Sequence, residues 1–165
     1  MVSIEFVEGT AEIDDIDAFL ERLSDIESTH ATTIQVFDAR YVTGRTHLER
    51  AVQLADRARR RGDTIADDWD VEILLYAAGR RQINRALEMG VAAGECPVVA
   101  VVVGGDTDAA ASELETLLEP AETLGDYDET RVREFFDVGN QELAAADGTL
   151  EDIVCERVAL LVVER

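Results

Sequence analysis

The sequence predicts a single α/β or α+β domain over residues 1–165, with a small, mostly antiparallel or mixed sheet of about four strands surrounded by helices. Its 165 residues fit one domain, and 47% of them are hydrophobic, enough for a real core. Short runs rich in β-branched residues alternate along the chain with longer stretches of helical periodicity. This alternation predicts strands and helices interleaved in one fold.

Four segments are expected to form strands, because each is short, rich in β-branched residues and bounded by Gly, Asp or Pro. They are residues 2–7, 33–38, 97–103 and 158–164. The last two are continuously apolar, which is typical of strands covered on both faces.

The segments between them are expected to be helical, because their apolar residues recur every three or four positions. The longest are residues 13–28, 45–62 and 68–89, and Gly90 is suited to end the last one. Asp106 or Thr107 starts a helix to about residue 119, before Pro120. Shorter helices are predicted over residues 129–136, 141–145 and 150–155, the last with a capping-box-like start at Thr149.

The charge of the chain limits its partners. Acidic residues number 36 against 15 basic ones, for a formal net charge of −21, which argues against binding anionic membranes or DNA over the whole surface. Every basic residue is Arg and none is Lys. At molar salt the Debye length falls to about 3 Å and screens most of the self-repulsion. We therefore expect a halophilic protein.

The compartment follows from three further observations. The first 17 residues lack the basic and apolar regions of a signal peptide. The longest apolar runs, residues 96–103 and 158–163, are far shorter than the ~20 residues that span a bilayer. Cys96 and Cys155 form no metal-binding spacing and are expected to be buried free thiols. The prediction is a soluble, cytoplasmic protein with no membrane partner.

The sequence offers little for catalysis. The two histidines form no zinc motif, and no serine lies in a GxSxG elbow. Gly104 and Gly105 follow a predicted strand and precede a helix, as in phosphate-binding loops, but the GxGxxG fingerprint and the P-loop Lys are missing. We expect the two glycines to form a tight turn and Asp106 to cap the helix that follows. The prediction is a protein that is not an enzyme and has no cofactor, metal or small-molecule substrate, with a nucleotide-binding enzyme at this turn as the least favoured alternative.

The informative feature is where the arginines lie. Residues 40–85 hold ten arginines against seven acidic residues, a net charge of +3, whereas the other 119 residues carry −24. In the helix predicted over 45–62, the apolar stripe is Leu48, Ala51, Val52, Ala55 and Ala58. Arg50, Arg57 and Arg61, spaced by seven and four, fall together on the opposite, exposed face.

Such an arginine surface suits a polyanion. Arg makes bidentate phosphate contacts and stacks on bases, and Tyr41 and His47 supply rings nearby, as proteins that hold single-stranded RNA do. The alternative is an acidic regulatory module that binds only protein. Its arginines would then form structural ion pairs with Glu49, Asp56 and Asp70.

Three stretches resemble a known family. They are residues 40–51 (RYVTGRTHLERA), residues 71–86 (VEILLYAAGRRQINRA) followed by Gly90, and residues 150–162 (LEDIVCERVALLV). They resemble the small kinase-binding subunit of the KEOPS complex, in a halophilic archaeal form. The similarity is dense over residues 33–103 and at the end, and thin over 104–145.

The resemblance implies a non-catalytic role. KEOPS makes N6-threonylcarbamoyladenosine in tRNA, and the subunit resembled here binds and supports its kinase-like ATPase subunit and recruits tRNA by the single-stranded 3′ CCA end. By position, the RNA contacts predicted are Arg45, His47, Arg50, Arg80, Arg81 and Arg85, with Arg57, Arg60 and Arg61 as an electrostatic rim. The predicted kinase interface comprises Phe135, Phe136, Leu143 and Leu150.

Overall fold

A three-stranded antiparallel sheet lies at the centre of the computed structural model, which describes residues 2–145 and 148–163. Its strands are β1 (Ile4–Ile13), β2 (Thr33–Asp38) and β3 (Gly94–Val103), arranged in the order β1-β3-β2. Both outer strands pair with β3 in antiparallel register, so that Ile4 and Thr33 both lie opposite Val103. The predicted α+β domain with a small antiparallel sheet is confirmed, with three strands instead of about four.

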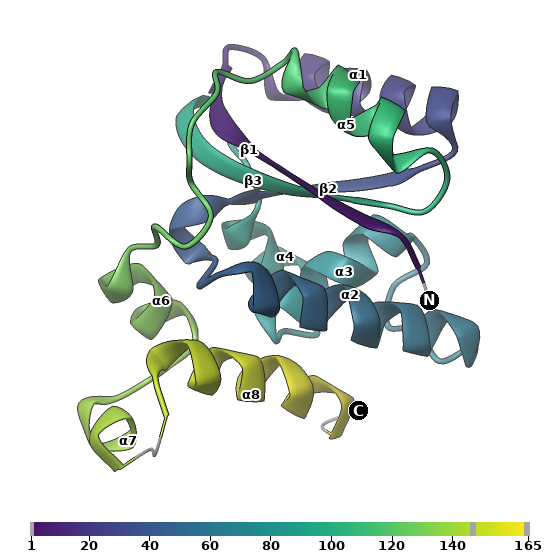
Figure 1. The fold of residues 1–165 in the computed structure, drawn as a ribbon. Helices are drawn as coiled ribbons and strands as arrows, with labels where there is room; N and C mark the ends of the chain where they lie inside the picture. The colour runs from purple at the N-terminus through teal and green to yellow at the C-terminus, as the bar shows by residue number, and fades with distance from the viewer. Residues whose placement is uncertain (1, 146–147, 164–165) are drawn as a thin grey trace.

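Helices cover both faces of this sheet (Figure 1). On one face lie α1 (Ile16–His30) and α5 (Thr107–Glu115). The other face packs on α2 (Arg45–Arg60), α3 (Trp69–Ala78) and α4 (Ile83–Ala86), together with the short 3₁₀ turns η1 (Ala39–Tyr41) and η2 (Leu87–Met89). Beyond α2 lie α6 (Glu129–Phe135), α7 (Asn140–Ala145) and α8 (Leu150–Val163), which form a further layer on that side.

The alternation of side chains along β3 divides the interior into two cores. Val98, Ala100 and Val102 belong to the core beneath α1 and α5. Val99, Val101 and Val103 belong to the larger core shared with α2, α3 and α8. All six are fully buried, which confirms the prediction that the continuously apolar run of β3 is covered on both faces.

The C-terminal segment is a helix, and the strand predicted over residues 158–164 is wrong for its described residues; Glu164 lies outside them. The buried residues of α8 follow helical spacing: Leu150, Ile153, Val154, Val158 and Leu161. Thr149 and Asp152 cap its start reciprocally, since each backbone N–H donates to the other's side-chain oxygen. The helix that begins at this cap continues through the apolar run, because Val158 and Leu161 extend the side of α8 that is buried against α2.

The helix predicted over residues 68–89 is interrupted. Gly79 has the left-handed φ of +62° and caps α3, and the Arg80 N–H then donates to the carbonyl of Leu75. The chain resumes as the short α4 and η2. This break places Arg80, Arg81 and Arg85 in a turn and a short helix rather than on one long rod. Elsewhere the boundaries shift by a few residues: β1 runs on to Ile13, and α1 therefore starts only at Ile16, capped by Asp15.

Candidate nucleic-acid interface

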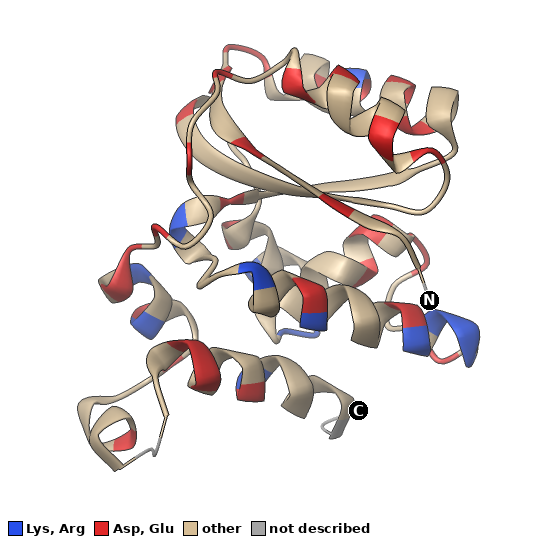
Figure 2. Cartoon of the chain, in the orientation of Figure 1, with Lys and Arg blue, Asp and Glu red and all other residues tan. Residues whose placement is uncertain are grey.

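Helix α2 presents one fully buried side and one charged side. Leu48, Ala51, Val52 and Ala55 have no exposed surface, which confirms the apolar stripe expected from the 3.6-residue period. Figure 2 shows that basic residues are frequent on α2 and the elements near it, whereas acidic residues predominate on α1 and α5.

The charged side of α2 divides into two stripes. On one, Arg45 and Arg60 are neutralised within the helix: Arg45 Nε lies 3.4 Å from Glu49 Oε1, and Arg60 Nε lies 3.1 Å from Asp56 Oδ2. The other stripe consists of Arg50, Arg57 and Arg61, which are all exposed. Within residues 2–145 and 148–163, none of these three has an acidic group within ion-pair distance. We call Arg50, Arg57 and Arg61 the open arginine stripe.

The arginines that follow Gly79 take different roles. Arg80 is turned inward: its guanidinium donates to the Phe135 carbonyl, lies over the Phe135 ring at 5.2 Å and comes within 3.8 Å of Asp137. It therefore ties the turn after α3 to α6, and is a structural residue in this chain. Arg81 and Arg85 are exposed. The described residues provide no ion-pair partner for Arg85.

Helix α8 lies between the open arginine stripe and the turn at Gly79. Burial raises the pKa of the Cys155 thiol, and Arg50 lies close enough to lower this pKa in part. A Cβ on Gly79 would lie 3.2 Å from the carbonyl oxygen of Arg157. Helix α8 therefore lies near Arg50 through Cys155 and near the turn at Gly79 through the Arg157 backbone. The structure does not merge all predicted RNA contacts into one patch.

His47 is a core residue, with only 1% of its surface exposed, so it lies apart from the exposed arginines. The Thr43 N–H donates to its Nδ1 at 3.3 Å, which leaves the proton on Nε2 to donate to the Ala77 carbonyl at 2.8 Å. Burial lowers the pKa of His47 to about 4, so the ring is neutral at pH 7. His47 positions α2 against α3. The sequence does carry a signal for this burial, because His47 lies four residues before Ala51 and so falls on the apolar side of α2.

The residues predicted to form a kinase-binding surface lie mostly in the core. Phe135, Phe136 and Leu150 are 3–5% exposed, and Leu143 packs against the same core with part of its side chain exposed. Phe135 packs edge-on against Tyr41, and Phe136 packs edge-on against His47. Among the described residues, the exposed large apolar side chains are ones that the sequence did not single out: Leu20, Ile83, Leu87, Leu160 and Val162.

The turn at Gly104 and Gly105 is closed by the protein itself. Both glycines have positive φ, and a Cβ on Gly105 would collide with the Ala31 carbonyl. Asp106 accepts a hydrogen bond from the Ala109 N–H and so caps α5. This geometry supports a structural turn over a phosphate-binding loop.

Other site types find no support in the described parts of the chain. No group of three or more His, Cys, Asp or Glu residues there could hold a metal ion. None of the described helices combines the length and apolarity that crossing a membrane requires. The described cysteines are unpaired: Cys96 is buried, as expected, which raises its pKa to about 11, whereas Cys155 is only partly buried.

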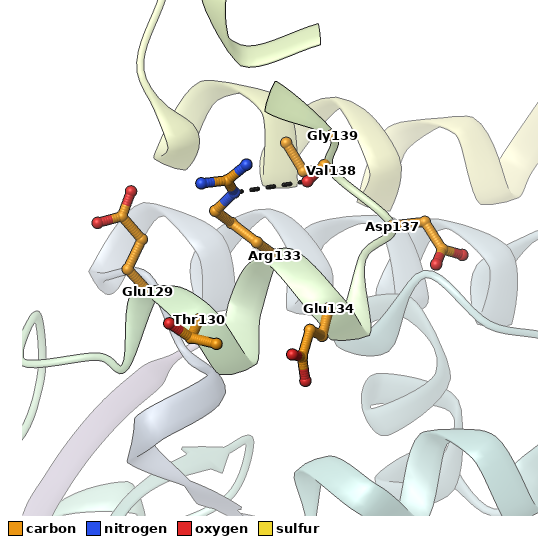
Figure 3. A pocket seen from close by; sticks show the side chains of 7 residues that line it. All are labelled: Glu129, Thr130, Arg133, Glu134, Asp137, Val138 and Gly139. Atoms are coloured by element: carbon orange, nitrogen blue, oxygen red, sulfur yellow. Dashed lines mark hydrogen bonds between the residues drawn. The ribbon is translucent and has the colours of Figure 1, made fainter. Parts of the chain in front are cut away.

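An open cavity of about 580 Å³ lies beside α6 (Figure 3). Three carboxylates line it, from Glu129, Glu134 and Asp137. Its one basic residue, Arg133, is already engaged, because it donates to the Val138 carbonyl at 3.5 Å and to the side-chain oxygen of Asn140. An acidic cavity with its only guanidinium occupied does not suit an anion, so it is not part of the candidate interface.

Comparison with known proteins now adds a second line of evidence. No individual curated protein matches the chain. The family model described as "Kinase binding protein CGI-121" matches residues 11–161, which is nearly the whole chain. The chain therefore belongs to the CGI-121 family of non-catalytic kinase-binding proteins.

Proposed function

We propose that this protein is the KEOPS subunit that binds and supports the kinase-like ATPase subunit and recruits tRNA, through its 3′ CCA end, for N6-threonylcarbamoyladenosine modification. The observation that carries the RNA part is the open arginine stripe: Arg50, Arg57 and Arg61 are exposed and lack acidic partners among the described residues. In a chain with a net charge of −21, three neighbouring arginines without acidic partners among the described residues form an unusual cationic surface. Such a surface is suited to binding a polyanionic partner.

The second arginine segment favours a single-stranded end over a duplex. Arg81 and Arg85 are exposed on the segment that also carries Ile83, whose side chain is 48% exposed. Arginine guanidinium planes can stack on unpaired bases, and an exposed apolar side chain between them adds a surface for van der Waals contact with a base. At molar salt the phosphate term is weakened, so such contacts must supply more of the affinity. The open arginine stripe would then contact the backbone further along the tRNA.

The test is the binding of intact tRNA against the same tRNA trimmed of its CCA end, in concentrated KCl. We expect intact tRNA to bind and trimmed tRNA to bind much more weakly. The double variant Arg57→Gln/Arg61→Gln should weaken binding and reduce the magnitude of the slope of log K against log salt by about 1.4 to 1.8, since each of the two phosphate contacts contributes roughly 0.7 on a single strand and roughly 0.9 on a duplex.

The chain supplies a matched control for that variant. Arg45→Gln/Arg60→Gln removes the same charge from the same helix, but from guanidinium groups already paired with Glu49 and Asp56. We expect the control to retain more affinity than Arg57→Gln/Arg61→Gln. Failure of both tRNAs to bind, even at the lowest salt that keeps the protein folded, would contradict the RNA part of the proposal.

The kinase-binding part rests on family membership. Among the interface residues predicted from sequence, Leu143 alone keeps a partly exposed side chain, because Phe135, Phe136 and Leu150 are buried. We therefore expect Leu143→Asp to weaken co-purification with the kinase-like subunit without unfolding the protein. Unchanged co-purification would move the contact to another surface.

One observation favours the second candidate, an acidic module that binds only protein. Four arginines of residues 40–85 lie within ion-pair distance of a carboxylate among the described residues, in the pairs Arg40–Asp38, Arg45–Glu49, Arg60–Asp56 and Arg80–Asp137. Asp70, also expected as an arginine partner, accepts the Val71 N–H instead. This candidate predicts kinase binding with no tRNA binding, so the same titration separates the two functions.

A further inference from the structure

A groove of about 300 Å³ runs along the free edge of β2, with α1 on one side and α3 on the other. The two helices belong to opposite faces of the sheet, as Figure 1 shows, so the groove opens where the layers end. Its apolar rim includes two of the most exposed large side chains, Leu20 at 46% and Leu87 at 57%. Leu23 and Leu74 are buried beneath them.

This edge is closed to a pairing strand. The Ile34 N–H already donates to Glu27 Oε2 at 2.8 Å, and the Val36 carbonyl accepts from the side-chain amide of Gln35 at 3.0 Å. Further along, Phe37 forms an isolated bridge with Gly90. Side chains thus occupy the backbone groups that an added strand would need. The groove suits an inserted side chain rather than an added strand.

The polar part of the groove is strongly acidic. Glu27 of α1 and Asp70 of α3 both line it, half-buried, and each lies close enough to other carboxylates to feel their repulsion. Burial is the main cause that raises the pKa of both groups. None of the thirteen residues that line the groove is basic. The two carboxylates therefore lie in a largely apolar groove with no cation among the described residues that line it.

We propose that this groove binds an arginine side chain presented by a protein partner, with its aliphatic stem on Leu20, Leu74 and Leu87 and its guanidinium between Glu27 and Asp70. The chemistry of arginine fits both halves of the groove, because its stem is apolar and its head is a weakly hydrated cation with five donors. Two carboxylates from different elements can share those donors. The groove and the open arginine stripe have opposite charge, so this site is additional to the proposed tRNA contact.

Other ligands fit the groove less well. An anion would be repelled by Glu27 and Asp70. A divalent cation would need more oxygen ligands, and the described residues hold no cluster of three or more potential metal ligands. The ammonium of lysine is more strongly hydrated and presents fewer donors, so it is a poorer match for a half-buried acidic pair.

The experiment is a ¹H–¹⁵N NMR titration of the full chain with two tripeptides, acetyl-Leu-Arg-Leu-amide and its citrulline counterpart. Citrulline keeps the shape of arginine and loses its charge, so it isolates the contribution of the two carboxylates. We expect the arginine peptide to shift the amides of Ile34, Val71 and Leu87 and to bind at least about tenfold more tightly than the citrulline peptide.

Substitutions of the two carboxylates test whether they cause the preference for the arginine peptide. Glu27→Gln and Asp70→Asn each keep a carbonyl oxygen for the backbone N–H that the carboxylate bonds now, so the fold is retained. Each should remove most of the preference for arginine over citrulline. Asp25→Asn is the control, because Asp25 is also on α1 and does not line the groove; it should leave the preference unchanged.

Three results would overturn the proposal: equal binding of the two peptides, no amide shifts up to about 10 mM peptide, or an arginine preference that survives both carboxylate substitutions. Light scattering on the same samples tests a different occupant. Self-association of the chain that is abolished by Leu87→Ser would mark the groove as a contact between copies, and would also contradict an arginine-specific site.

Discussion

The buried histidine of α2 makes the stability of this protein depend on pH in a definite direction. His47 is 1% exposed, and its pKa falls from 6.5 to about 4 because burial disfavours the charged ring. Between these two values the unfolded chain binds a proton at this residue and the folded chain does not. The free energy of unfolding therefore falls as the pH drops from above 6.5 towards 4.

The size of the effect follows from the displacement of the pKa. Each pKa unit corresponds to 1.36 kcal/mol, so the contribution of His47 that is lost across this window is about 3 kcal/mol. This is a large part of the stability of a small domain. Protonation would also put a proton on Nδ1, which accepts the Thr43 N–H in the neutral ring. The link between α2 and the preceding turn would then be lost.

The assay compares wild type with His47→Gln by urea unfolding at fixed high salt, from pH 7.5 down to 4. Gln does not titrate and can still donate to the Ala77 carbonyl that accepts from Nε2. At pH 7.5 we expect the variant to be less stable, because it loses the fit of the ring against Phe136. The difference should shrink by about 3 kcal/mol as the pH falls, since the carboxylates common to both proteins cancel. A difference that stays constant over this range, or an NMR titration of His47 near pH 6.5, would refute the reasoning.

Three other substitutions, one of them with a matched control, test the packing that holds the arginine surfaces in place. Gly79→Ala should lower the free energy of unfolding by about 1–3 kcal/mol, because φ is +62° and the backbone of α8 is close. Gly62→Ala has a similar φ of +68° but open space, so in urea unfolding it should cost less; an equal cost would mean that α8 adds nothing. Leu48→Ala, at a position with no exposed surface, should cost about 2–5 kcal/mol and lower the Tm, and a Tm within a degree or so of wild type would contradict its core role. Glu72→Ala should cost about 1–3 kcal/mol, because the buried carboxylate accepts the backbone N–H groups of residues 65–66; unchanged proteolysis of that loop would count against this role.

The sequence was sufficient where a second signal supported the apolar pattern. The stripe of α2 follows a helical period, and the apolar run of β3 is rich in Val and bounded by Pro97 and Gly104, which favours a strand; both predictions are confirmed. The end of the chain was ambiguous, because a continuous apolar run fits either a doubly covered strand or a buried helix. The helical spacing from Leu150 to Leu161 resolves it, but only when the run is considered together with the cap at Thr149. The strand prediction treated the run alone.

Predicting exposure was harder than predicting secondary structure. Phe135 and Phe136 lie on α6 and at its end, a short helix in a thinly patterned, acidic region, and local sequence cannot say what covers such a residue. What covers them is distant in the chain: Tyr41 packs on one ring and His47 on the other. Ile83 and Leu87 show the converse, since they lie after the break at Gly79 within the helix predicted over residues 68–89 and are exposed.

Helix α2 shows which ion pairs of a helix can be predicted from sequence and which cannot. Spacing of four joins Arg45 to Glu49 and Asp56 to Arg60, so these two pairs were foreseeable, and both form. The open arginine stripe has no acidic residue three or four positions away within α2, which also follows from the sequence. The sequence does not show whether acidic residues from other helices or strands lie beside these three arginines.

Helix α8 is the element best placed to supply them, because it packs along α2 and begins with acidic residues. Its Glu151 instead accepts the hydroxyl hydrogen of Tyr127, which together with Thr149 holds the pKa of that carboxyl below its usual range. Helix α8 thus directs this carboxylate to a neutral donor, and no carboxylate of the described residues lies within ion-pair distance of the open arginine stripe. In a chain with 36 acidic residues, this arrangement keeps a cationic surface available to a partner that brings its own negative charge.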